Sequence, residues 1–76
     1  MYKFMICANP EEHEMTGNTM VLTNNDHGKE EAVQSLSRRF PLSIICVYHL
    51  DEMQKVTSKP SYARYKRQPN GEIIPV

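Results

Sequence analysis

The chain has 76 residues and a formal net charge of zero. This length accommodates one domain, residues 1–76, and no second core. A neutral chain argues against strong non-specific binding to nucleic acid or to a membrane surface. No apolar run reaches the roughly 18–20 residues that span a bilayer, and the apolar run at the N-terminus is too short for a signal peptide. We therefore expect a soluble, cytoplasmic protein.

The charges are distributed unevenly along the chain. Residues 1–52 contain four basic and eight acidic residues, whereas residues 53–76 contain five basic residues and one acidic residue. The sequence thus predicts a dipolar molecule with an acidic N-terminal loop region and a basic C-terminal hairpin.

The N-terminal part predicts two strands. Residues 2–8, YKFMICA, are apolar, aromatic and β-branched, and Pro10 should end this strand because proline cannot donate to a ladder. Residues 9–18 are polar and predict a loop, and residues 19–23, TMVLT, predict a second strand. Consecutive strands joined by a polar turn region are expected to pair antiparallel as a hairpin.

Residues 24–40 carry the helix signal. Asn25 or Asp26 suits the N-cap, acidic residues follow in the first turns, basic residues occupy the last turn, and Pro41 should stop the helix. One apolar stripe is predicted at Ala32, Val33, Leu36 and Phe40. The opposite, solvent-facing side is predicted at Lys29, Glu30, Gln34 and Arg38.

The rest of the chain predicts further strands. Residues 42–50, LSIICVYHL, are too continuously apolar to be half-exposed and indicate a central strand. Residues 53–58 are expected to continue in extended form. Residues 61–67 and 72–76 predict a terminal hairpin, in which Pro69 takes the second position of a type I turn and Gly71 the left-handed position after it.

The element order is β-β-α-β-β-β, which predicts a two-layer α+β domain with one amphipathic helix packed on a mainly antiparallel sheet. One helix of this length cannot cover five strands completely. Part of the outer face of the sheet, or one of its edges, should therefore meet solvent or a partner.

The histidines, cysteines and acidic residues form no known catalytic motif. The three histidines and two cysteines show no CxxC, HxxxH or HExxH spacing, so we expect no metal, no cofactor and no enzymatic activity. Residues 11–14, EEHE, could hold a cation weakly but are typical of a solvated loop. Cys7 and Cys46 lie inside apolar runs and are expected to be reduced core thiols. Cys46 and His49 are three apart on a strand and should point to opposite faces.

The stretch of residues 61–67 is the candidate binding surface. Strand alternation should place Tyr62, Arg64 and Lys66 on one face, and Ala63, Tyr65 and Arg67 on the other. The predicted binding residues are Tyr62, Arg64, Tyr65, Lys66, Arg67, Lys55 and Lys59. Arg38 and Arg39 could extend this patch.

Three hypotheses for the role of residues 61–67 remain open. Tyrosine and arginine are enriched at protein–protein hot spots, which favours a non-catalytic interaction module of regulator or inhibitor type that docks an unidentified protein or a second copy of itself. Alternating tyrosine and cations also suit a single-stranded nucleic acid. The stretch also suits a solvated outer hairpin, which we favour over the nucleic-acid interpretation. The general plan is similar to that of small accessory proteins of phages and mobile elements that block a host complex, an analogy with no motif behind it.

Overall fold

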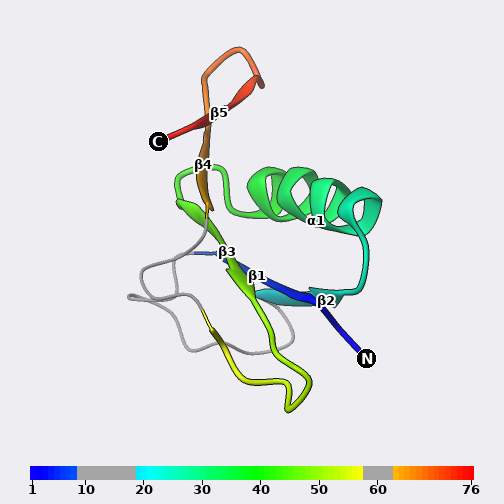
Figure 1. The fold of residues 1–76 in the computed structure, drawn as a ribbon. Helices are drawn as coiled ribbons and strands as arrows, with labels where there is room; N and C mark the ends of the chain where they lie inside the picture. Colours follow the sequence, from blue (N-terminus) through cyan, green and yellow to red (C-terminus); the bar gives the residue numbers. More distant parts are fainter. Residues whose placement is uncertain (9–18, 58–62) are drawn as a thin grey trace.

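The computed structural model describes residues 1–8, 19–57 and 63–76, and it shows one helix packed on a five-stranded antiparallel sheet (Figure 1). The elements are β1 (Phe4–Ala8), β2 (Met20–Thr23), α1 (Asp26–Arg39), β3 (Ile45–His49), β4 (Ala63–Arg67) and β5 (Ile73–Pro75). The prediction of a small α+β fold is thereby confirmed. Lys59 and Tyr62 of the predicted binding surface, and the acidic residues 11–14, lie outside the described residues.

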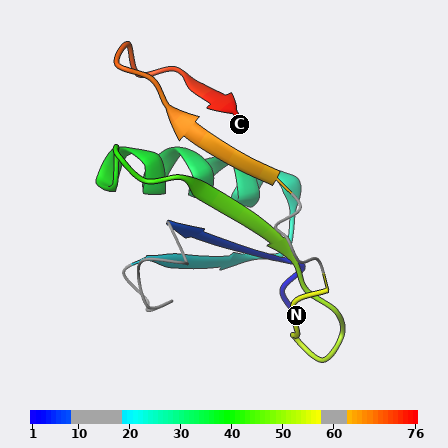
Figure 2. The ribbon, with the colours of Figure 1, turned by 90° about the vertical axis from the view of Figure 1, so that its left-hand side faces the viewer.

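The sheet has the order β2-β1-β3-β4-β5, with every neighbouring pair antiparallel. β1 pairs with β2 through Phe4 and Thr23, as the predicted hairpin requires. β3 is the middle strand, as its continuous apolar sequence predicts. The strand begins only at Ile45, however, and Leu42 lies in the turn after the helix with 90% of its surface exposed, so the predicted start of this strand at residue 42 is wrong. Figure 2 shows the strands side by side in this order, with β2 and β5 at the two edges.

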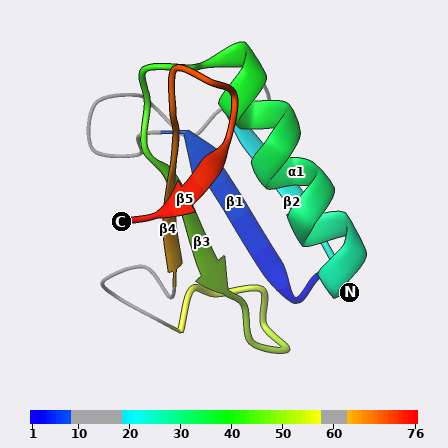
Figure 3. The ribbon, with the colours of Figure 1, turned by 90° about the horizontal axis from the view of Figure 1, so that it is seen from above.

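One face of the sheet forms the main core with α1. Alternate residues of β1 and β3 point to the helix, and the buried cluster consists of Phe4, Ile6, Ala8, Ala32, Val33, Leu36, Ile45 and Val47. Phe40 is half-buried and packs against this cluster, so the predicted helical stripe is confirmed. Figure 3 shows α1 lying over β1 and β2, with the β4–β5 hairpin beside its flank.

The opposite face of the sheet carries the other half of each strand. Met5, Cys7 and Cys46 are buried at its centre, with 8%, 0% and 6% of their surface exposed. Leu22 on β2 and Arg64 on β4 are exposed on either side of this centre. The expectation that part of this face meets solvent is therefore confirmed at its margins, while its centre is buried.

The helix begins and ends where its sequence indicates. Asn25 is the N-cap, and its Oδ1 accepts a hydrogen bond of 2.7 Å from the amide of Gly28. Phe40 is the C-cap, and Pro41 follows it directly. Lys29 is the exception to the predicted solvent face. Its side chain is only 17% exposed and its ammonium lies 5.0 Å from the centroid of the Phe4 ring.

Residues 51–54 form a turn in which the Gln54 amide donates to the Asp51 carbonyl at 2.9 Å, so the predicted extended conformation is wrong at residues 53 and 54. Val56 pairs with Leu50 in a single antiparallel bridge, and residue 58 lies outside the described residues. Asp51 Oδ1 accepts from the amides of Met53 and Lys55, and Gln54 adopts a left-handed conformation with φ of 60°. The Gln54 side chain bonds both backbone groups of Tyr2, at 3.0 and 2.9 Å. An aspartate side chain that bonds amides just after it favours a turn over a strand.

We predict that Gly28→Ala destabilises the protein. Alanine usually stabilises a helix by about 1 kcal/mol relative to glycine, but a Cβ atom at Gly28 would lie 2.0 Å from Oγ1 of Thr23. We expect a net loss of about 1–3 kcal/mol in the free energy of unfolding, measured by urea denaturation.

The matched control is the double variant Thr23→Ala/Gly28→Ala, completed by Thr23→Ala alone. Removing the Thr23 hydroxyl relieves the close approach, so the double variant should recover most of the loss and the cycle should show a favourable coupling. A single Gly28→Ala variant as stable as the original protein would contradict the prediction.

Candidate functional site

The strand β4 divides the predicted binding surface between the two faces of the sheet. Ala63 and Tyr65 are half-buried and pack against the core on the helix side. Arg64 and Lys66 are exposed on the other side. The predicted alternation is confirmed for these four residues, and its consequence is that Tyr65 does not share a surface with Arg64 and Lys66.

The turn that carries Lys55 does not belong to the same surface. Lys55 is exposed and lies in the segment that follows β3. Figures 1 and 2 both place this segment at the end of the molecule opposite to the β4–β5 loop. Lys55 therefore does not extend a patch centred on the hairpin.

The hairpin loop holds β4 and β5 in a defined geometry. Gly71 has φ of 88°, in the left-handed region that glycine adopts without strain. Its amide donates to the Gln68 carbonyl at 2.8 Å, and the Gln68 amide donates to the Glu72 carbonyl at 2.7 Å. The predicted three-residue loop Pro69-Asn70-Gly71 is confirmed.

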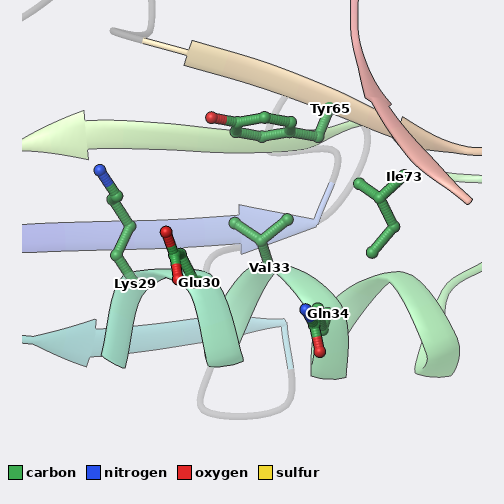
Figure 4. Close-up of a pocket in the computed structure, with 6 residues that line it drawn as sticks. All are labelled: Lys29, Glu30, Val33, Gln34, Tyr65 and Ile73. Atoms are coloured by element: carbon green, nitrogen blue, oxygen red, sulfur yellow. The ribbon is translucent and has the colours of Figure 1, made fainter. Parts of the chain in front are cut away.

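A hollow of about 230 Å³ lies between α1 and this hairpin (Figure 4). Lys29, Glu30, Val33 and Gln34 line it from α1, while Tyr65 and Ile73 line it from β4 and β5. The Tyr65 ring and Ile73 side chain form the wall opposite the helix. The hollow thus combines an apolar interior with one ammonium and one carboxylate.

A second hollow of about 380 Å³ adjoins the first, since Gln34 and Ile73 line both. Its remaining residues are Arg38 at the end of α1, Arg67 on β4 and Gly71 in the loop. We call the two hollows together the α1–hairpin groove. Its lining residues are Lys29, Glu30, Val33, Gln34, Arg38, Tyr65, Arg67, Gly71 and Ile73.

The groove has an asymmetric charge. Arg38 and Arg67 line the second hollow, and no acidic residue is among the residues that line it. Lys29 at the other end lies 3.4 Å from the Asp26 carboxylate, and Glu30 lies beside it. Within residues 1–8, 19–57 and 63–76, neither Arg38 nor Arg67 takes part in an ion pair. The hollow lined by the two arginines is therefore positive and lacks a counter-charge from the described chain.

Sequence reasoning identified Arg67, Tyr65 and, as an extension, Arg38, but it did not place them together. Gln34 and Arg38 are exposed, as predicted for the solvent face of the helix, and they also form one rim of the groove. The spacing of Glu30, Gln34 and Arg38, at i, i+4 and i+8, shows one polar line on α1. Only the position of the hairpin shows that this line borders a hollow.

The cysteines and histidines described by the structure do not form a reactive group. Cys7 and Cys46 are direct partners in the β1–β3 ladder, and both are buried thiols that are not joined by a disulfide. His49 is on the helix side, with its ring centroid 5.3 Å from that of Phe4. Among the described residues, no three His, Cys, Asp or Glu side chains lie together as metal ligands. In the same residues, no helix has the length and apolar character to cross a membrane.

Burial raises the pKa of the Cys7 thiol from its ordinary 9.0 to about 11, and the neighbouring Cys46 adds to the rise. Cys7 is therefore protonated at neutral pH. A thiol acts as a nucleophile or metal ligand in its thiolate form, so Cys7 is unreactive at neutral pH in the folded protein.

Comparison with protein-family models, with curated protein sequences and with solved structures gives no match. The geometry of the α1–hairpin groove is therefore the main indication of what the protein does.

We predict that the Cys7 thiol makes the free energy of unfolding fall as the pH rises from about 9 to about 11. In this range the unfolded thiol ionises while the folded thiol keeps its proton, so the free energy of unfolding falls as pH rises. The full effect corresponds to about 2–3 kcal/mol. The difference in stability between the original protein and Cys7→Ala, measured by urea denaturation at several pH values, should change by this amount.

Other groups titrate in the same range, and they are common to both proteins, so the comparison isolates Cys7. A difference that stays constant from pH 8 to about pH 11 would contradict the raised pKa.

Proposed function

We propose that the protein is a non-catalytic interaction module that binds an acidic segment of a partner protein in the α1–hairpin groove. The observation that carries this proposal is the convergence of Arg38 and Arg67, from two different elements, on one hollow that no described acidic residue lines. Two residues of the predicted binding surface, Tyr65 and Arg67, line this groove. Arg64 and Lys66 lie on the opposite face of the sheet.

The two arginines favour a carboxylate ligand. Two like charges that line one hollow repel each other, and a bound anion removes that repulsion. The guanidinium group presents paired donors that match a carboxylate, and such charge-assisted hydrogen bonds are among the stronger polar contacts in proteins. An acidic side chain of a partner is therefore the expected occupant of this end of the groove.

The adjoining hollow favours a protein segment. Val33, Tyr65 and Ile73 line it, and tyrosine and arginine are typical of the few residues that dominate binding energy. A segment with one apolar side chain followed by carboxylates would place the apolar group against Tyr65 and the carboxylates beside Arg38 and Arg67. Glu30 disfavours the reverse orientation because it would meet the carboxylates.

The nucleic-acid alternative depends on the outer face of β4. Arg64 and Lys66 are exposed there and take part in no ion pair within the described chain. The described aromatic residue of β4, Tyr65, lies on the other face against the core. Stacking on a base and contact with phosphate would thus draw on different faces of the strand, and this favours the protein partner.

A regulator or inhibitor that binds an acidic surface needs no catalytic group, and an unreactive, protonated Cys7 thiol is compatible with such a role. Cys7 and Cys46 lie opposite each other as thiols and not as a disulfide, which is usual in a reducing compartment, so we propose that the protein acts in the cytoplasm.

The test uses fluorescence anisotropy with two probes, a labelled peptide with one phenylalanine followed by three glutamates, and a labelled ten-nucleotide oligothymidine. We expect the protein to bind the peptide in the micromolar range and Arg38→Ala/Arg67→Ala to bind it about tenfold more weakly. Urea denaturation of each variant checks that the fold is retained.

The matched control is Arg64→Ala/Lys66→Ala, which removes two positive charges from the opposite face of the same sheet. This variant should bind the peptide as the original protein does. Equal losses in both variants would mean that net charge, not the groove, attracts the peptide. Tighter binding of oligothymidine, lost in the control variant and with a steep salt dependence, would support the nucleic-acid alternative.

A further inference from the structure

The two edges of the sheet differ in how well they are protected from pairing. β5 at one edge has three residues and includes Pro75, which has no amide to donate. β2 at the other edge is MVLT, with no charged residue and no proline. Charged residues and prolines are the usual means by which edge strands avoid pairing with another chain. β2 has neither.

The register of β2 shows which backbone groups point away from the sheet. The Ala8 amide donates to the Thr19 carbonyl at 2.9 Å, so Thr19 faces β1. Alternate residues of a strand bond to opposite sides, so Val21 and Thr23 also face β1. The amides and carbonyls of Met20 and Leu22 therefore point to the free edge. No described strand pairs with them there.

The sequence of this edge is self-complementary. Residues 19–23 read Thr-Met-Val-Leu-Thr, which is nearly the same in both directions around Val21. If two copies pair antiparallel about Val21, Met20 of one copy lies opposite Leu22 of the other. Because these are the residues whose backbone groups point outward, the register forms four hydrogen bonds and uses the outward amides and carbonyls of both Met20 and Leu22.

The same register keeps both faces of the sheet continuous. Met20 and Leu22 lie on the face away from α1, where Leu22 is 39% exposed, and each would cover the other across the two-fold axis. Val21 of each copy stays on the helix side, where it packs against the core. Antiparallel apolar pairs of this kind stabilise a sheet, and no like charges meet.

We propose that two copies of this chain associate through β2, in antiparallel register about Val21, to form one continuous ten-stranded sheet. The area buried by pairing two short strands is small, so the dimer is weak and forms in the range of about 10 µM to 1 mM. The α1–hairpin groove lies toward the other edge, between α1 and β5. The dimer therefore presents two open grooves, which would bind a partner with repeated acidic segments more tightly than one groove does.

The test is sedimentation velocity over the range of about 10 µM to 1 mM. The weight-average mass of the original protein should rise from that of a monomer toward that of a dimer. Leu22→Lys places a charge on the pairing edge and should keep the protein monomeric over the whole range. Ile74→Lys is the matched control, because it makes the same kind of change on the other edge strand, and it should dimerise as the original protein does.

A second variant makes the result independent of the effect of Leu22→Lys on folding. In the proposed register Val21 faces its own copy in a pair without hydrogen bonds, where the Cα atoms lie about 4.5 Å apart, within the range that a disulfide spans. Val21→Cys should therefore form a covalent dimer under mild oxidation faster than Ile74→Cys does. A constant monomer mass, or equal cross-linking at both positions, would overturn the proposal and leave the test of the groove unaffected.

Discussion

The structure depends on the burial of β1 on both of its faces. All five residues of FMICA are buried, although only one face of the sheet is covered by α1. Phe4, Ile6 and Ala8 contact the helix layer, while Met5 and Cys7 lie on the opposite face. Burial of one large apolar side chain contributes about 1.5–3 kcal/mol, so this one strand supplies a large part of the driving force of a small domain. The strands β2 and β3 pair with β1, and α1 packs on it.

The groove follows from the same core. Tyr65 and Ile73 pack against the cluster that β1 and α1 form, and this contact holds the β4–β5 hairpin beside the helix. Arg67 follows Tyr65 by two residues, so its side chain points to the same side of the sheet, where it lines one hollow together with Arg38 at the end of α1. The packing of Tyr65 against the core thus determines the position of Arg67 and, with it, the positive charge of the hollow. Its unneutralised charge is what makes it a candidate site.

The two proposals use opposite edges of one sheet. The β5 side carries cations, a proline and the groove, whereas the β2 side is apolar and uncharged. Association through β2 would leave the groove free. In the proposed dimer the two grooves would form a bivalent binding surface, and the buried, protonated Cys7 is consistent with a structural role for the cysteine pair.

The sequence by itself determined the local features of this protein. Strand alternation separated Arg64 from Tyr65, the Asn25 cap and Pro41 bounded the helix, and the Pro-Asn-Gly turn set the hairpin, because each depends on residues close together in the chain. Only the tertiary structure decided that Arg38 and Arg67 share a hollow, that Lys29 lies over Phe4, and that β2 is an edge strand. These facts depend on how far the sheet twists and which strands become neighbours. Such properties arise from packing between residues that are distant in sequence, and no local pattern encodes them.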